Sequence, residues 1–382
     1  MLTAVEIVLA LPIVALTLGS TLGLLTNSHW FFRGWEYPRL QIAALPVLLC
    51  GLFAGVDLIF DDAWQWWDTA LVVAASLVVG WHLVRVFPFL PIAKNQVLHD
   101  HRDMGGRGIR VRVLTSNVQM ENTDYDRFIA MVRERNPDVV VVLETDGKWA
   151  EGLQPLFDEF KHFVSVPQEN WYGMVMLTNC ELVEHEVRFI VQEDIPSIHA
   201  RMKLPSGGPD AEEFVLHCLH PRPPEPIRGT HATSRDAELV VVGREIETAD
   251  EPTIVTGDLN DVAWSHTTRL FLRLSALLDP RRGRGLFTTW PVDHPFWRVP
   301  LDHVFHSEDF TFGDLQRCED IGSDHFPICA DLVWRRTAED LQEPDPTFGN
   351  DEEEAQAKID EAEEVNAREV RSPERTQPQV IL

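Results

Sequence analysis

The first ninety residues contain three long apolar stretches, separated by loops that are rich in tryptophan. The stretches cover about residues 2–25, 40–60 and 70–87. Each is close to the roughly 20 residues with which a helix crosses a bilayer, and tryptophan is enriched at membrane–water interfaces. A cleaved signal peptide is the alternative for the first stretch, although the basic segment of such peptides is missing, and buried helices of a soluble domain are the alternative for the other two. The pattern predicts a membrane anchor of three transmembrane helices in residues 1–90.

The basic residues that flank these stretches give conflicting predictions of the orientation in the membrane. The first loop contains Arg33 and Arg39, the second has no basic residue, and further basic residues follow the third stretch. Basic residues favour the cytoplasmic side of short membrane loops. With the first loop and the C-terminal part taken to lie on opposite sides of three spans, the two basic groups compete. The sequence therefore predicts a multi-pass protein of the cell membrane and leaves the side of its C-terminal part open.

Residues from about 108 to 336 have the pattern of one α/β domain, in which short β-rich runs alternate with amphipathic segments. Residues 124–135 are polar with apolar side chains at helical spacing, and an Asn-Pro pair ends this predicted helix. The β-branched run 139–143 then predicts a fully buried strand. Glu144 follows that strand directly, so the unit ends in a carboxylate.

A second unit of the same design lies further along the chain. Residues 234–248 are helix-like, a Glu-Pro pair follows, and residues 253–256 form the predicted strand, which runs into Gly257-Asp258. A buried carboxylate is costly unless it is paired or binds a metal. Two such carboxylates in two similar units predict that Glu144 and Asp258 converge in one cleft at the edge of a sheet.

Other segments also carry polar side chains where the local pattern favours apolar ones. An alternating, strand-like run ends near Asn117, and an Asn follows the second acidic strand at position 260. The remaining members of this set are His220, Asp302, Asp324 and His325. These short motifs, in this order, resemble the endonuclease/exonuclease/phosphatase superfamily, which includes apurinic endonucleases, neutral sphingomyelinases and inositol-polyphosphate 5-phosphatases.

The resemblance spans about residues 109–334, nearly the whole predicted domain. It implies a four-layer α/β sandwich, in which two packed mixed β-sheets are flanked by helices. It also implies an enzyme, a hydrolase that acts on phosphoester bonds with the help of Mg²⁺ or Mn²⁺. These cations favour carboxylate and amide oxygens. By resemblance, Glu144 is the principal metal ligand, and Asn117 and Asp324 complete or support the site.

The resemblance assigns the catalytic roles as well. Asp258 would orient or deprotonate the attacking water, and Asn260 would hold this water or the phosphate. His325, oriented by Asp302, would face the phosphoryl group as a base or as a charge stabiliser. His220 would contact a phosphate oxygen or the leaving group. Which of Asp258 and His325 is the base stays open.

Three further residues have weaker claims to a role in the site. His217 lies three residues before His220, but the His-Pro-x-Pro-Pro setting favours His220. Arg281 and Arg284 belong to a basic, Gly-rich loop within an acidic chain. This loop is either a plain turn or a binding site for a phosphate group of the substrate.

Composition narrows the choice of substrate. The chain has 33 basic and 60 acidic residues and a formal charge of −27, a field that repels nucleic acid. A bound divalent cation can invert the electrostatics of one cleft, so a phosphate substrate remains compatible. We expect a lipid-linked or small phosphomonoester, phosphodiester or pyrophosphate. A nuclease is the first alternative, and a catalytically inactive, membrane-tethered binding module is the second, although every expected catalytic position holds a competent residue.

The last segment, residues 337–382, differs in character from the domain. It is acidic, contains Pro and Gln, and has few large apolar residues with which to bury surface. A mostly disordered tail is the expectation. The alternative is a short acidic helix between Asp351 and Arg368 that docks on an unknown protein partner.

Overall fold

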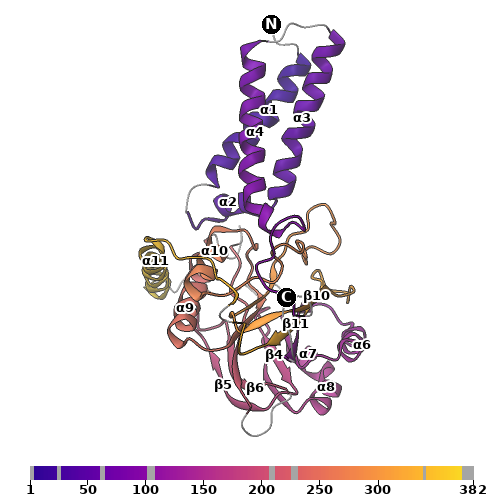
Figure 1. Cartoon of the computed structure of the whole chain (residues 1–382), viewed down its shortest axis with the longest axis vertical. Coiled ribbons are helices and arrows are strands. Elements are labelled where there is room, and N and C mark those ends of the chain that lie inside the picture. Colours follow the sequence, from indigo (N-terminus) through magenta and orange to yellow (C-terminus); the bar gives the residue numbers. More distant parts are fainter. Residues whose placement is uncertain are drawn as a thin grey trace.

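The polypeptide forms a bundle of helices that stands on one end of an α/β domain (Figure 1). The computed structural model describes residues 4–23, 27–60, 65–100, 108–205, 211–224, 231–338 and 341–371. The bundle consists of α1 (Ala4–Leu22), α3 (Arg39–Phe60) and α4 (Trp66–Val86). Three short turns lie between the bundle and the domain, namely α2 (Trp30–Arg33), η1 (Gly34–Glu36) and η2 (Phe87–Phe89).

The bundle contains two helices that are long and apolar enough to cross a membrane. Within the described residues, these segments are Arg39–Val56 and Trp66–Phe89, and less than a third of each is buried. The first helix offers only the shorter apolar stretch Ile7–Leu22. The structure therefore provides two candidate spans where the sequence predicted three, because the described apolar part of the first helix falls short of the required length.

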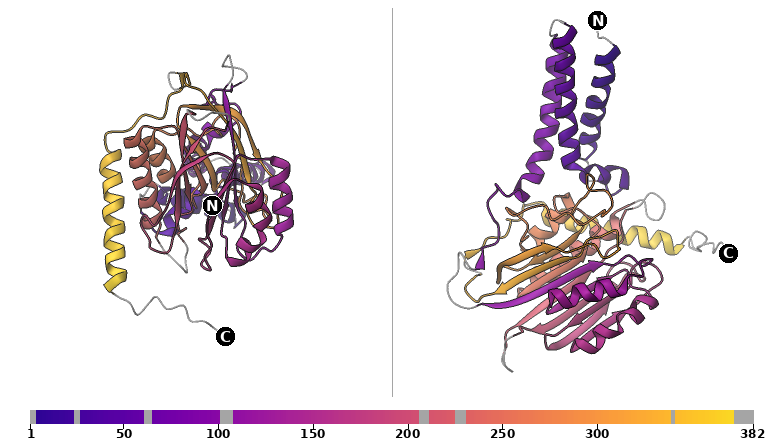
Figure 2. Two further views of the ribbon diagram at one scale, coloured as in Figure 1. Left: turned by 90° about the horizontal axis from the view of Figure 1, so that it is seen from below. Right: turned by 90° about the vertical axis from the view of Figure 1, so that its right-hand side faces the viewer.

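The first loop and the α/β domain lie at the same end of the bundle (Figures 1 and 2). This corrects the expectation that they lie on opposite sides. Helix α1 runs towards the domain, α3 runs away from it and α4 runs back towards it, so α4 ends at the same end of the bundle as the first loop (Figure 1). The ion pair of Arg33 with Asp236 of the domain, at 2.7 Å, fixes this arrangement. The two groups of basic residues therefore do not compete.

Eleven strands build the domain in the described part of the chain. They are β1 (Ile109–Asn117), β2 (Val139–Leu143), β3 (His162–Val166), β4 (Met174–Thr178), β5 (Leu182–Arg188), β6 (Ser197–Lys203), β7 (Glu213–Leu219), β8 (Thr253–Asp258), β9 (Asp302–His306), β10 (Phe310–Arg317) and β11 (Ile328–Trp334). The helices are α6 (Tyr125–Arg135), α7 (Gly147–Gly152), α8 (Gln154–Glu159), α9 (Thr233–Ala249), α10 (His266–Ser275) and α11 (Asp351–Arg371).

The strands form two mixed sheets with an apolar core between them. One sheet has the order β10-β11-β1-β2-β4-β3 and the other the order β5-β6-β7-β8-β9. Valines and other apolar residues of both sheets meet in this core, among them Val113, Val141, Leu216 and Ile254. Helices α6 to α8 cover the outer face of the first sheet, and α9 and α10 cover that of the second (Figure 2). The predicted architecture of two packed mixed sheets with helices outside is confirmed.

The two helix–strand units seen in the sequence occupy equivalent places in the two sheets. Each forms a crossover between parallel strands, β1-α6-β2 in one sheet and β7-α9-β8 in the other. The register places Asn117 beside Leu143, so Glu144 emerges next to Asn117. In the second sheet Leu219 lies beside Gly257, so the residues that follow these strands also emerge together. The hydroxyl groups of Thr115 and Thr256 meet between the sheets, which brings β1 and β8 face to face.

The expectation of a disordered acidic tail is wrong for residues 351–371, which form helix α11 along α9 (Figure 2). Small apolar side chains at helical spacing give this helix a narrow apolar stripe, and Ala355 packs with Val240 and Leu270. Its charges find buried partners, since Arg273 binds Asp351 at 2.8 Å. The alternative of an acidic helix is what the structure contains, with the domain itself as the docking surface. The end of the tail, from residue 372, lies outside the described residues.

Helix α9 also carries a buried carboxyl group that opposes folding at high pH. Glu238 is buried, and its Oε1 atom has no hydrogen-bond partner among the described residues. Burial raises the pKa of Glu238 to about 8. In the unfolded chain the group ionises near its ordinary value of about 4.3. Its contribution to stability is therefore complete below that value and is lost as the pH rises towards 8.

Replacing Glu238 by glutamine should remove this pH dependence. Relative to the parent, Glu238→Gln should become more stable as the pH rises from 5 to 9, by an amount on the order of a few kcal/mol. Thermal unfolding of the full chain, followed by circular dichroism at several pH values, measures this difference. The exposed Glu247 on the same helix supplies the control variant Glu247→Gln. A difference between Glu238→Gln and parent that stays constant with pH would contradict this account.

Candidate active site

Three of the predicted polar residues meet where the two sheets come together. The side-chain nitrogen Nδ2 of Asn117 donates to Oε1 of Glu144 at 2.8 Å and to Oδ2 of Asp258 at 3.1 Å. Asn117 and Asp258 are buried, while Glu144 keeps partial access to the cleft. The carboxylates at the ends of β2 and β8 thus converge on one amide, as the repeated units predicted.

The backbone at these strand ends has conformations that residues other than glycine seldom adopt. Glu144 has a φ of 62° and Asn260 a φ of 50°, both in the left-handed region. Gly257 has a φ of 149°, and a Cβ atom there would lie 1.8 Å from the carbonyl oxygen of Leu219. Such strain persists only where the surrounding structure enforces it, and it clusters at functional sites. The turn after β8 therefore depends on the glycine that precedes Asp258.

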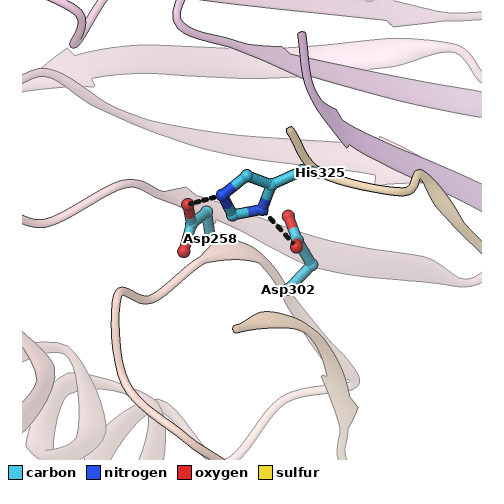
Figure 3. Close-up of side chains that lie close together, drawn as sticks. All are labelled: Asp258, Asp302 and His325. Carbon is cyan, nitrogen blue, oxygen red and sulfur yellow. Dashed lines mark hydrogen bonds and ion pairs between the residues drawn. The ribbon is translucent and has the colours of Figure 1, made fainter. Parts of the chain in front are cut away.

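His325 lies between two carboxylates at the floor of this site. Its Nδ1 atom is 2.8 Å from Oδ2 of Asp302, and its Nε2 atom is 3.6 Å from Oδ2 of Asp258 (Figure 3). Burial disfavours the charged ring, but the carboxylates of Asp302 and Asp258 outweigh it and raise the pKa of His325 to about 10. The two carboxylates therefore favour the charged ring, with one nitrogen fixed by Asp302 and the other directed towards Asp258.

His220 follows β7 and lies on the other side of Asp258. Its Nε2 atom is 3.9 Å from Oδ2 of Asp258, and burial lowers the pKa of His220 to about 4. The ring is therefore neutral and offers a hydrogen bond rather than a charge. His217 instead packs against the ring of His199 within the sheet, with centroids 4.6 Å apart, away from the cleft. The structure places His220, and not His217, in the site.

The two remaining predicted residues stand at the rim of the site. Asp324 accepts a hydrogen bond from the indole nitrogen of Trp290 at 3.0 Å, and its backbone N–H donates to Oε1 of Gln119 at 3.1 Å. Asn260 donates from its side chain to the carbonyl oxygen of Pro221 at 3.0 Å. The backbone N–H of Asn260 donates to Asp258, at 2.9 Å. Both residues are therefore fixed by neighbours and still line the cleft.

The cleft above these groups has a volume of about 420 Å³. Six predicted residues line it, and the lining also includes residues outside the predicted set, several of them aromatic and four of them from the segment between α1 and α3. These additional residues are Trp30, Arg33, Gly34, Tyr37, Trp171, Tyr172, Pro223, Pro224, Trp290 and Leu301. The tryptophans of the first loop were noted in the sequence as interfacial residues. No local signal connects them with strand ends more than a hundred residues away.

The donor set of this cleft fits a divalent cation. Burial raises the pKa of Glu144 to about 7, and the nearby carboxylates of Asp258 and Asp324 act in the same direction. A bound cation would offset this repulsion, and Glu144 and Asp324 line the cleft with carboxylate oxygens of the kind that Mg²⁺ and Mn²⁺ prefer. Asn117 does not line the cleft, and its side-chain oxygen accepts from the backbone N–H of Gln119 at 3.0 Å, so it supports the site through its hydrogen bond to Glu144.

A second group, formed by Asp258, Asp302 and His325, has its ligand atoms within 4.8 Å of one another. Here the hydrogen bond between His325 and Asp302 already occupies one nitrogen of the ring and one carboxylate oxygen. An oriented histidine–carboxylate pair accounts for this group without a metal ion.

The predicted role of Arg281 and Arg284 in substrate binding is wrong, because neither residue lines the cleft. Arg281 is buried, forms an ion pair with Asp279 at 2.8 Å and donates to Nδ1 of His303 at 2.7 Å. Arg284 donates to the carbonyl oxygen of Val97 at 2.6 Å. Arg281 thus packs against His303 of β9, and Arg284 packs over the ring of Phe312 of β10.

Comparisons with known proteins agree with this architecture. The model of the endonuclease/exonuclease/phosphatase family matches residues 114–325. A crystal structure of a protein of that family from Bacteroides thetaiotaomicron has a TM-score of 0.50 and 17% identity, and the match covers 60% of this chain and 100% of the other. The human Nocturnin catalytic domain with bound sulfate has a TM-score of 0.50 and 14% identity, with coverage of 61% and 96%. At these identities the two structures show a shared fold. No curated protein matches the chain.

Proposed function

The chain belongs to the endonuclease/exonuclease/phosphatase family, and from this premise we propose that it is a membrane-attached phosphoesterase that depends on a divalent cation. The family consists of hydrolases that act on phosphoester bonds. The observation that carries the proposal is the convergence of Asn117, Glu144 and Asp258 within hydrogen-bond reach, beside the paired His325 and Asp302. Residues 108–336 would form the catalytic domain and residues 1–90 its anchor.

We assign the cation to Glu144 and Asp324, with Asn117 supporting the site through its hydrogen bond to Glu144. When bound, it would neutralise negative charge on the phosphoryl oxygens, which is the main requirement of phosphoryl transfer. This assignment is supported by the acidic character of the cleft. Among the described residues that line it, Arg33 is the one basic side chain apart from histidine, and Arg33 is engaged by Glu36 and Asp236. Without a cation, an anionic substrate would face the carboxylates of Glu144 and Asp324, which have no arginine or lysine partner among the described residues of the cleft.

We assign the proton transfer to Asp258. Its Oδ1 atom is held by the backbone N–H of Asn260, and Oδ2 accepts from Asn117. In this position Asp258 would take a proton from water while the water oxygen bonds to phosphorus and the bond from phosphorus to the leaving oxygen breaks. His325, held by Asp302, would stabilise the phosphoryl charge rather than act as the base. His220 and Asn260 would donate hydrogen bonds to phosphate oxygens.

The nature of the cleft favours a lipid-linked or small phosphoester over nucleic acid. A duplex-binding enzyme neutralises several phosphates with basic side chains, and the chain as a whole carries a charge of −27. A nuclease remains the second candidate because its family contains both classes. An inactive binding module is the third, and the complete set of competent polar residues in one cleft argues against it.

We also propose that the bundle spans the membrane and that the catalytic domain faces the cytoplasm. Arg33, Arg39, Arg85 and Lys94 all lie at the domain end of the bundle, whereas the second loop has no basic residue. Basic residues are retained on the cytoplasmic side during insertion, before the folded protein neutralises them.

Protease protection tests this orientation. With a tag at the C-terminus, we expect protease to remove the tag from inverted membrane vesicles and to leave it intact in right-side-out vesicles. The opposite pattern would place the catalytic domain outside the cell. Recovery of the chain in the soluble fraction would contradict the proposal that the bundle spans the membrane.

The function itself is tested with the full chain in detergent and a panel of substrates. The panel contains bis-p-nitrophenyl phosphate, plasmid DNA, a phosphatidyl or polyprenyl phosphate and a sphingomyelin-like diester, each with Mn²⁺ and with chelator. We expect metal-dependent turnover of the small ester and of at least one lipid ester, with little action on DNA. Preferred cleavage of DNA would establish the nuclease instead. A folded chain that hydrolyses none of these would favour the binding module.

A further inference from the structure

The juxtamembrane segment Trp30–Tyr37 forms one side of the active-site cleft. Trp30, Gly34 and Tyr37 line the same cavity as Glu144 and His325, although more than a hundred residues separate them in the chain. This segment consists of α2, η1 and Tyr37, and it lies between the bundle and the domain (Figure 1). The cleft is therefore incomplete in the domain alone.

Buried polar contacts hold this segment in place. Arg33 binds Asp236 at 2.7 Å, and the indole nitrogen of Trp264 donates to the carbonyl oxygen of Glu36 at 2.8 Å. The hydroxyl group of Tyr37 donates to the carbonyl oxygen of Asn260 at 2.6 Å. The segment thus contacts the catalytic turn after β8 directly, which a flexible tether would not do.

The wall of the cleft is apolar and aromatic, while its floor is polar. The side chains that form the wall are Trp30, Tyr37, Trp171, Tyr172, Trp290 and Leu301. Such a wall has nothing with which to neutralise further phosphates, but it suits a hydrocarbon group, since binding pockets take their affinity from apolar surface and their orientation from a few polar groups. The non-reacting part of the substrate should therefore be apolar.

Exposed aromatic side chains that suit a bilayer surface lie where the bundle meets the domain. Phe296 and Trp297 are 86% and 60% exposed, and Gln41 at the start of α3 donates to the carbonyl oxygen of Phe296 at 2.5 Å. Phe31 of α2 and Phe87 at the end of α4 are exposed as well. Aromatic residues at this level are typical of the membrane–water interface. The cleft then opens close to the membrane surface.

We infer that the segment Trp30–Tyr37 determines substrate specificity by binding the apolar chain of a membrane-resident phosphoester, whose phosphate group reaches the polar floor. This inference rests on the proposed phosphoesterase function and specifies its substrate class. The anchor would then be part of the active site rather than only an attachment.

Gly34 offers a direct test. It has a φ of −56°, which any residue adopts, and a Cβ atom there would meet nothing within 4 Å. A large side chain at this position can therefore enter the cleft without strain in the segment. Gly349, where a Cβ atom also meets nothing within 4 Å and which does not line the cleft, supplies the matched control.

The experiment compares Gly34→Phe, Gly349→Phe and parent, as full chains in one detergent with Mn²⁺. The substrates are the preferred lipid phosphoester of the panel, its short-chain form with the same head group, and bis-p-nitrophenyl phosphate. We expect Gly34→Phe to lower kcat/KM for the long-chain ester by roughly tenfold or more relative to its effect on the two short esters. Gly349→Phe should behave as parent. Trp30→Ala should reduce the preference for the long chain in the same direction.

Equal losses on long and short esters, or no loss on either, would overturn this inference while leaving the phosphoesterase proposal intact. So would a parent enzyme that hydrolyses bis-p-nitrophenyl phosphate or DNA but no lipid ester. A parent that hydrolyses no phosphoester at all would remove the proposed function together with the inference.

Discussion

Replacing Asp258 by asparagine should lower kcat by about 10²–10⁴-fold, the range that a positioned general base contributes. The amide keeps the shape of the side chain but cannot take a proton from water. Both oxygens of Asp258 accept from N–H donors, so the NH2 group of the asparagine would face one of these donors, and a lower unfolding temperature is expected beside the loss of rate. Rate measurements with a saturating substrate, together with the unfolding temperature, separate these two effects.

The exposed Asp126 on α6 supplies the control for this variant. Asp126→Asn should retain the rate of the parent. If Asp258→Asn kept more than about a tenth of the parental kcat, proton transfer to Asp258 would not be part of the reaction, because even a weak general base contributes more.

Replacing Glu144 by glutamine should raise the concentration of Mn²⁺ needed for half-maximal activity by at least roughly 10–100-fold, the cost seen when even an outer partner of a metal site is lost. Glutamine preserves the hydrogen bond with Asn117 and removes the charge that attracts the cation. A titration of activity with Mn²⁺, and of Mn²⁺ binding by electron paramagnetic resonance, gives two independent readings.

Glu151 on α7 is exposed and serves as the control, so Glu151→Gln should need the same Mn²⁺ concentration as the parent. Unchanged Mn²⁺ affinity in Glu144→Gln would show that Glu144 does not bind the metal and that the metal site lies elsewhere. The acidic group around Asp302 would then be the next candidate.

The polar floor of the site was predictable from the sequence because local pattern determines it. A terminal carboxylate adds nothing to the packing of a buried β-branched strand, so Glu144 and Asp258 were recognisable as candidate site residues. Two units of the same design then indicated that these residues converge, and the strand registers confirm it. The conformations of Glu144 and Asn260 could not be seen in the sequence, since only the fold enforces a positive φ there.

The apolar wall was not predictable because it depends on contacts between distant parts of the chain. Tyr37 reaches Asn260 only after the first loop has returned to the domain end of the bundle. The same arrangement brings the basic residues of the first loop and those at the end of α4 to one end of the bundle. Counting charges in the sequence had not revealed this. Helix α11 was missed for a related reason. Its own apolar surface is small, and its order depends on Arg273 and other partners that α9 and α10 supply.

The central claim is that this cleft hydrolyses phosphoesters with a divalent cation, and removal and return of the metal tests it most directly. The measurement follows hydrolysis of bis-p-nitrophenyl phosphate by the full chain in detergent, first after chelation and then after Mn²⁺ or Mg²⁺ is restored. The account predicts that turnover disappears with chelator and returns with the metal, and that Asp258→Asn shows no such return. Turnover that persists in chelator, or a folded chain that neither binds Mn²⁺ nor hydrolyses the ester, would contradict it.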